Sequence, residues 1–309
     1  MVKIGIPKAF LYYRYHHLWE TFLTHLGIDY IVSPDTNKDI MNSGMTYAID
    51  EACLSSKIYL GHVAWLRDKC DYILVPRIST PGHSGSVCTK FLAIYDVVKN
   101  TFREDGIRLL YYNIDLWSAD IELRAFLKMG RFLGKKRSQT MVAYLVAKQA
   151  EKAAQLLDEY LLDQQLQETG IKILIVSHRY NICDGYIGGP IQKLLRQQGA
   201  VPIIGDYANR RETLERSNEI SATLPWSFNR ELVGAVALLK RQVDGIILMT
   251  TFPCGPDSLV NEILLRKVKD IPMINLIVDG QEGTAGLETR IESFLDIIRF
   301  KKEDGHAGF

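Results

Sequence analysis

Short apolar runs and helix-periodic stretches alternate along the first half of the chain. Residues 3–7 form a short apolar run that predicts a strand, and residues 30–32 predict a second strand. Between them, apolar residues recur at helical spacing and predict a helix that ends at Gly27: Leu18, Phe22, Leu23 and Leu26. The first unit of the chain is therefore a strand, a loop, a helix and a second strand.

The same order of elements begins again in the second half of the chain. Residues 172–177 predict a strand, Pro190 marks the start of a helix that ends near Gly199, and residues 201–204 predict the next strand. Farther along each half, the segments "CDYILVPRIST" and "VDGIILMTTF" both contain an aspartate followed by an apolar run that ends in a turn. Such continuous apolar runs are typical of buried parallel strands.

The repeated alternation predicts an α/β protein with two Rossmann-like, doubly wound parallel-sheet lobes. We assign residues 1–117 to an N-terminal lobe and residues 170–309 to a C-terminal lobe. Residues 118–169 carry a long stretch rich in Ala, Leu and Val without a strand pattern, which we interpret as a helical bridge. The alternative is an accidental correspondence between the halves, because strands and helices alternate in many α/β proteins.

Composition and charge narrow the classes of function. The chain has 309 residues, of which 47% are hydrophobic, enough for about two domains. Its 37 basic and 36 acidic residues leave a formal net charge of +1, so no general attraction to nucleic acid or to a membrane surface is expected. No apolar stretch reaches the ~20 residues of a membrane span, and the N-terminus does not resemble a signal peptide. We therefore expect a cytoplasmic protein with neither a nucleic-acid nor a membrane partner.

Five cysteines are scattered through the chain in different settings. An odd number of thinly spread cysteines does not indicate a disulfide framework. Cys88 and Cys254 lie in turns that follow a buried strand and lead into a helix, and Cys53 lies in the first turn of another predicted helix. Cys70 directly precedes a strand and Cys183 lies in a loop, so we predict that these two are packing residues.

A helix start carries unpaired N–H groups and about half a positive charge, so it stabilises a thiolate or a bound anion. We expect side-chain caps at these three helices from Asp50, from Ser86, and from Asp257 or Ser258. Three thiolates from separate segments fit an iron–sulfur cluster that keeps one iron open. The residue pattern also leaves two alternatives, a thiol hydrolase with Cys254 as its nucleophile and purely structural thiols.

Several ordered blocks of the sequence resemble one family. The blocks are "DEACLSSKIYLGHV", "HRYNICDGYIGGPIQKLLRQQG", "LPWSFNRELVGA", "FPCGPDSLVNEIL" and "VDGQEGTAGLETRIESFLDII". They resemble the proteins related to 2-hydroxyacyl-CoA dehydratases, specifically the stand-alone or fused cluster-binding partner of the CoA-substrate-specific enzyme activases. The resemblance extends over most of the chain, from Lys3 to Ile298.

The resemblance implies a 4Fe-4S-type iron–sulfur cluster held between two lobes by Cys53, Cys88 and Cys254. It also implies a partner, an ATP-hydrolysing activator protein, which in related dehydratases delivers a low-potential electron for elimination of water from a 2-hydroxyacyl-CoA. Some relatives carry a double-cubane cluster and reduce small molecules instead. Ser55 and Thr89 stand where the family usually has proline, which leaves the cluster type open. Because the chain has no GxxxxGK[ST] phosphate loop, any ATP-driven step belongs to the partner.

Five further residues are candidate contacts of the cofactor. Lys57 and His62 lie on the helix that begins near Cys53, and His178 and Tyr180 follow the first strand of the C-terminal lobe. Glu282 lies in a glycine-containing turn and is a candidate oxygen ligand or proton donor. The structural alternatives are a solvated lysine, a histidine bonded to the backbone, and a carboxylate that serves a turn or cap.

We therefore expect a cytoplasmic iron–sulfur protein of anaerobic metabolism that acts as an electron-accepting component or as a low-potential reductase. Its expected partners are the activator and a homologous dehydratase-type subunit or a second copy of the chain. The alternative is a non-catalytic, bilobed subunit that binds a small ligand or serves as a scaffold, with structural thiols. The sequence assigns no catalytic residue.

Overall fold

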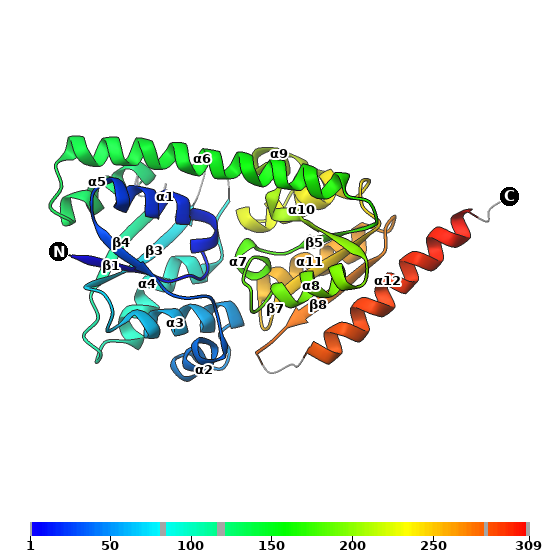
Figure 1. Ribbon diagram of the computed structural model, residues 1–309, viewed down its shortest axis with the longest axis horizontal. Helices are drawn as coiled ribbons and strands as arrows, with labels where there is room; N and C mark the ends of the chain where they lie inside the picture. Colours follow the sequence, from blue (N-terminus) through cyan, green and yellow to red (C-terminus); the bar gives the residue numbers. More distant parts are fainter. Residues whose placement is uncertain (1, 81–84, 116–120, 281–283, 307–309) are drawn as a thin grey trace. The chain divides into compact units, whose positions relative to one another are not determined.

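The computed structural model of the chain describes residues 2–80, 85–115, 121–280 and 284–306. Its fold is α/β, with two four-stranded sheets in which neighbouring strands are parallel (Figure 1). Contacts divide the chain into an N-terminal unit, Met1–Leu156 with Pro225–Ser227, and a C-terminal unit, Leu157–Leu224 with Phe228–Phe309. The predicted fold class is confirmed.

The N-terminal unit has the strand order β2-β1-β3-β4. Its strands are β1 (Lys3–Ile6), β2 (Asp29–Val32), β3 (Tyr72–Thr80) and β4 (Leu109–Asp115). Its helices are α1 (Tyr12–His25), α2 (Lys38–Tyr47), α3 (Leu54–Leu66), α4 (Thr89–Thr101), α5 (Glu122–Phe132) and the larger part of α6 (Arg137–Gln167). Within this unit, α1 and α3 cover opposite faces of the sheet (Figure 1), as a doubly wound topology requires.

The C-terminal unit repeats this plan, with the strand order β6-β5-β7-β8. Its strands are β5 (Ile171–Val176), β6 (Ala200–Ile204), β7 (Gly245–Thr251) and β8 (Met273–Val278). Its helices are α7 (Arg179–Ile182), α8 (Gly189–Gln197), η1 (Gly205–Tyr207), α9 (Arg210–Arg216), η2 (Ser217–Glu219), α10 (Ser227–Leu239), α11 (Gly255–Lys267) and α12 (Thr284–His306). The division between the units falls inside α6, after Leu156.

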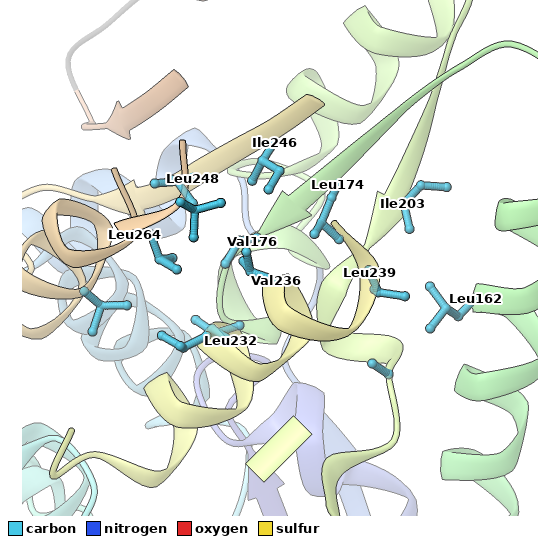
Figure 2. Close-up of a cluster of buried hydrophobic side chains, with 14 of the residues drawn as sticks. Leu162, Leu174, Val176, Ile203, Leu232, Val236, Leu239, Ile246, Leu248 and Leu264 are labelled. Atoms are coloured by element: carbon cyan, nitrogen blue, oxygen red, sulfur yellow. The ribbon is translucent and has the colours of Figure 1, made fainter. Parts of the chain in front are cut away.

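The core of the C-terminal unit explains why its strands have nearly continuous apolar sequences. Figure 2 shows Leu174 of β5 and Leu248 of β7 in one cluster with Val236 of α10 and Leu264 of α11. Alternate residues of β5 and β7 point to the opposite face of the sheet, which helices also cover. Ile175 and Ile247, which lie on that face, are buried as well. Each such buried side chain contributes about 1.5–3 kcal/mol relative to an exposed one.

An aspartate joins the first and third strands of each sheet by the same pair of hydrogen bonds. In the N-terminal unit, Lys3 N donates to Asp71 Oδ2 at 2.7 Å, and Asp71 N donates to Lys3 O at 2.9 Å. In the C-terminal unit, Lys172 N donates to Asp244 Oδ2 and Asp244 N donates to Lys172 O, both at 2.8 Å. The correspondence between "CDYILV" and "VDGIIL" is therefore structural.

Other predictions of secondary structure have mixed outcomes. Gly27 and Gly199 follow their helices with φ of 63° and 74°, which confirms the predicted helix ends. The described residues of the predicted helical bridge form α5 and α6. The edge strand β4, in contrast, was not predicted.

Candidate functional site

The topology marks one edge of each sheet as the place for a site. In both sheets the chain leaves the first strand in one direction and the third strand in the other, so a topological switch point lies between β1 and β3 and between β5 and β7. Ligands of doubly wound folds bind at such a point, beyond the carboxyl ends of the strands. The loops after these strands, and the helix N-termini that face the same edge, are therefore the candidate site of each unit.

Three of the five cysteines occupy the same structural position. Cys53, Cys88 and Cys254 are the N-cap residues of α3, α4 and α11. Each helix runs antiparallel to the strands of its own sheet, so its N-terminus faces the carboxyl edge. None of the three helices has a side-chain hydrogen bond at its cap. These thiols therefore lie beside the positive ends of helices whose first N–H groups are not capped by a side chain.

The predictions of side-chain caps for these three helices are wrong. Cys53 replaces Asp50, Cys88 replaces Ser86, and Cys254 replaces both Asp257 and Ser258 as the residue that begins the helix. Asp257 instead lies inside the first turn of α11, and Ser258 Oγ donates to Cys254 O at 2.7 Å. The rule that favours Asp and Ser at helix starts does not hold where a turn places a thiol at that position.

Cys53 has a polar neighbour within its own helix. Its Sγ lies 3.2 Å from Ser56 Oγ, one turn along α3. If the thiol is ionised, sulfur can only accept, so Ser56 donates. Lys57, the predicted cofactor contact on the same turn, donates from Nζ to Asp50 O at 2.9 Å and is half-buried.

The structure places the second predicted contact on this helix, His62, in the interior of the N-terminal unit. The ring is 0% exposed. Nδ1 lies 2.8 Å from Ser33 Oγ and Nε2 lies 3.0 Å from Thr36 Oγ1. Burial, with a smaller contribution from the positive charge of Lys8, lowers the pKa of His62 to about 3. A neutral imidazole with both nitrogens bonded therefore ties the β2–α2 loop to α3.

An aromatic residue joins the two cysteine-capped helices of the N-terminal unit. Phe10 follows β1 and has φ of 49°, in the left-handed region that non-glycine residues seldom adopt. Its ring stacks on Tyr59 of α3 at 5.4 Å and meets Phe91 of α4 edge-on at 5.2 Å. The loop after β1 is thus packed against the second turn of α3 and the first turn of α4.

The backbone just before Cys88 pairs with a distant segment of the same unit. Ser86 N donates to Pro225 O at 2.9 Å, and Ser227 N donates to Ser86 O at 2.8 Å. The residues form an isolated parallel bridge between Ser86 and Trp226. We did not predict this bridge, because its partners are about 140 residues apart and no local pattern relates them.

The C-terminal unit has a buried polar network at the corresponding edge. His178, two residues after β5, places Nε2 2.9 Å from Asp257 Oδ1 in the first turn of α11. Asn229 Nδ2 donates to the same oxygen at 2.7 Å, and Thr250 Oγ1 donates to Asp257 Oδ2 at 2.9 Å. The carboxylate therefore connects β5, β7 and α10 to the turn that carries Cys254.

The buried pair in this network is ionic. Burial alone would lower the pKa of His178, but the negative charge of Asp257 outweighs it and raises that pKa. Burial would raise the pKa of Asp257, but His178 and the hydrogen bonds from Asn229 and Thr250 outweigh it and lower that pKa. His178 also stacks on the predicted contact Tyr180, with ring centroids 5.0 Å apart. The sequence pointed to His178 and Tyr180 but not to Asn229 or Thr250.

The remaining thiols have the environment of packing residues. Burial raises the pKa of both Cys70 and Cys183 to about 11. Cys70 Sγ donates to Leu66 O at 3.3 Å. It also packs against Gly5, where an added Cβ would lie only 2.5 Å from the sulfur. Both thiols therefore stay protonated near neutral pH.

The last predicted site residue, Glu282, lies outside the described residues. Among those that are described, no three His, Cys, Asp or Glu side chains form a group that could hold a metal ion. In the same part of the chain, no helix combines the length and the apolar character needed to cross a membrane.

Comparisons with known proteins give one family and a weak structural likeness. Residues 3–207 match the family described as CoA enzyme activase uncharacterised domain (DUF2229). A search of the curated proteins found no match. Among solved structures, a Zn(II)-bound variant of AdcAII from Streptococcus pneumoniae is 12% identical, with 97% of this chain and 98% of that chain covered and a TM-score of 0.29. ZnuA is 11% identical, with 96% and 98% covered and a TM-score of 0.28. TM-scores this low carry no argument about fold or function.

Proposed function

The chain belongs to the CoA enzyme activase uncharacterised domain family, and from this premise we propose that it is an iron–sulfur protein. In this proposal Cys53, Cys88 and Cys254 together ligate the cluster, and the protein accepts electrons from an ATP-hydrolysing activator. It then acts as the electron-accepting component, or as a low-potential reductase, of a system related to the 2-hydroxyacyl-CoA dehydratases. The family name supports a role together with a CoA-dependent enzyme. The proposal of a cluster is based on the three cysteines.

The observation that carries the proposal is the shared position of the three cysteines. Each is the N-cap of a helix whose first turn faces the carboxyl edge of a parallel sheet. Helix N-termini stabilise the negative charge of a thiolate, which is the form that binds iron. Cysteine thiolates are the usual protein ligands of iron–sulfur clusters. The chemistry of three cysteine donors therefore suits the group, and in this proposal the two thiols with raised pKa values are not ligands.

When bound, such a cluster supplies one-electron transfer at a potential that depends on its surroundings. Ser56 would act on this potential by donating a hydrogen bond to the Cys53 thiolate, because hydrogen bonds to a ligand sulfur stabilise the more negative, reduced form. Lys57 holds the backbone ahead of α3 through Asp50 O. His62 contributes to the position of α3 only, since both of its nitrogens are occupied.

In the C-terminal unit, the ionic pair fixes the turn of Cys254. Asp257 lies three residues after Cys254 and is held by His178, Asn229 and Thr250. The His178–Asp257 ion pair lies at the edge where β5 and β7 end and has no net charge. We assign His178 and Tyr180 to the surroundings of the cofactor. Glu282 remains a predicted oxygen ligand or proton donor.

The test is iron and acid-labile sulfide analysis of protein purified or reconstituted without oxygen, followed by electron paramagnetic resonance after reduction. We expect bound iron and sulfide, and replacement of Cys53, Cys88 or Cys254 by Ala should remove more than half of the iron. Cys70→Ala and Cys183→Ala serve as matched controls and should retain it. Equal loss in all five variants would refute the assignment of ligands. Protein that takes up no iron would favour the alternative of a ligand-binding or scaffold subunit.

A further inference from the structure

A cavity of about 260 Å³ in the N-terminal unit is lined almost entirely by cations. It lies between α5 and the start of α6. Five of its seven lining residues are basic, the other two are Leu127 and Thr140, and none is acidic; the five are Arg124, Lys128, Arg131, Lys135 and Arg137. The chain as a whole is nearly neutral, with a formal charge of +1, so this concentration of charge is local.

The positions of these residues in the two helices direct their charge toward one place. Arg124, Lys128 and Arg131 follow each other at helical spacing on one face of α5. Lys135 lies in the connection, and Arg137 is the first residue of α6. Like charges at such spacing repel one another. In the described part of the chain, Arg131, Lys135 and Arg137 have no carboxylate partner that would offset the repulsion.

The wall of this cavity is held in a fixed shape. A Cβ added to Gly130 of α5 would lie 2.2 Å from Thr140 Oγ1 of α6, so the two helices touch at this point. Thr140 Oγ1 donates to Lys136 O at 3.0 Å, and Lys135 N donates to Gly130 O at 2.9 Å. The N-terminus of the long helix α6 adds its partial positive charge at the same place. Four of the five cations are exposed and Lys135 is half-buried, so an anion can reach them from solvent.

A second cavity shares one lining residue, Lys135, with the first. Its volume is about 380 Å³, and apart from Lys135 and His25 its lining is uncharged: Leu26, Ser138, Gln139 and Val142. A ligand with an anionic part and an uncharged part matches this pair of cavities, with the anionic part in the first and the uncharged part in the second.

We propose that the cationic cavity binds the diphosphate group of a small-molecule ligand, and that the second cavity receives the rest of a nucleotide. Arg and Lys donate charge-assisted hydrogen bonds to phosphate oxygens, and the planar Arg fork matches two of them. The small, concave volume of about 260 Å³ favours a small anion over a flat macromolecular surface. This site is separate from the cysteines and does not depend on the proposed cluster.

The test is titration calorimetry of the full chain with inorganic pyrophosphate at constant ionic strength. We expect the double variant Lys135→Gln/Arg137→Gln to weaken binding about 10–100-fold, because it removes two charge-assisted contacts. The control is Lys38→Gln/Arg103→Gln, which removes one lysine and one arginine from the same unit. Lys38 is the first residue of α2 and Arg103 has a 74% exposed side chain, so binding should not change.

Circular dichroism and the melting temperature establish that each variant folds, and Arg131→Gln gives a second, independent variant of the cavity. Absence of pyrophosphate binding, or binding that the cavity variants leave unchanged, would overturn the proposal. ADP and coenzyme A distinguish the source of the diphosphate. Tighter binding of either than of pyrophosphate supports a nucleotide, whereas equal or weaker binding overturns the role of the second cavity.

Discussion

His62 and His178 are both buried, but their surroundings favour opposite charge states. His62 has two hydroxyl partners and no carboxylate, so burial keeps it neutral and lowers its pKa to about 3. His178 has the Asp257 carboxylate, which raises its pKa despite burial. Since each histidine lies in a different unit, their effects on stability can be separated by substitution.

We predict that the N-terminal unit loses stability in mild acid because of His62. In the unfolded chain this histidine takes up a proton near pH ~6.5, whereas the folded unit excludes the proton until about pH 3. The free energy of unfolding should therefore fall by up to about 1.4 kcal/mol for each pH unit below ~6.5. Urea unfolding between about pH 7 and 5 measures the slope, which His62→Gln should reduce and His17→Gln, at an exposed position, should not.

We predict the opposite pH dependence for the His178–Asp257 pair. Because the pKa of His178 is raised, its stabilising contribution is complete below pH ~6.5 and is lost as pH rises through the folded pKa. Asp257→Asn should abolish this alkaline loss and destabilise the C-terminal unit by about 3–5 kcal/mol, because it leaves His178 without its counter-charge. Urea unfolding and NMR titration of the imidazole measure both effects.

Asp270→Asn is the matched control for that variant. Asp270 pairs with Lys240 at 2.6 Å, but its side chain is 58% exposed. An exposed ion pair contributes little to stability, because solvent screens the two charges. A loss in Asp257→Asn no larger than in Asp270→Asn would contradict an ionic pair in the interior.

At the scale of elements, α2 and α3 cross at a contact that only glycine permits. A Cβ at Gly44 would lie 2.0 Å from Lys57 O, and a Cβ at Gly61 would lie 2.0 Å from Ile40 O. Each glycine thus faces a carbonyl group of the other helix. The crossing positions α3, whose first turn follows Cys53.

We predict that Gly61→Ala forces the two helices apart. The expected loss of stability is about 1–3 kcal/mol, the usual cost of adding atoms to a packed interior. Gly185→Ala is the control, since a Cβ there has no atom within 4 Å. A thermal melt compares the two, and an unchanged melting temperature for Gly61→Ala would show that the crossing is looser than the structure has it.

The elements also show what the sequence could and could not predict. Strands buried on both faces have continuous apolar runs, and these were found. β4 lies at the edge of its sheet and alternates, with Tyr111 39% exposed between the buried Leu110 and Tyr112, so it lacks such a run. The hydrogen-bond partners within the site could not be predicted for another reason. His178 and Asp257 are 79 residues apart, and a local sequence pattern carries no information on such pairs.

At the scale of the whole molecule, the two units are repeats of one plan that differ in their sites. Both have the same strand order. In both, an aspartate, Asp71 or Asp244, joins the first and third strands by hydrogen bonds, and we call this arrangement the aspartate clamp. The N-terminal unit has two cysteine caps and the C-terminal unit has one, with an ionic network beside it. The repeat could be predicted from the sequence, whereas the difference between the sites could be predicted only for the cysteines.

We predict that each clamp stabilises its own unit. Asp71→Ala leaves Lys3 N without its acceptor and should cost about 1–3 kcal/mol. Asp244→Ala should cost somewhat more, because Asp244 also pairs with Lys302 at 2.7 Å. Amide hydrogen exchange should rise in β1 and β3 for the first variant and in β5 and β7 for the second. Exchange that rises equally in both units would show that the units do not unfold independently.

The raised pKa values of Cys70 and Cys183 have a practical consequence for labelling. With a pKa of about 11, only about one such thiol in ten thousand is ionised at pH 7. Maleimide is an electrophile that the thiolate attacks, so a maleimide reagent would leave both of these thiols nearly unmodified. Fluorophores can therefore be attached at Cys53, Cys88 or Cys254 one at a time without removing the interior cysteines.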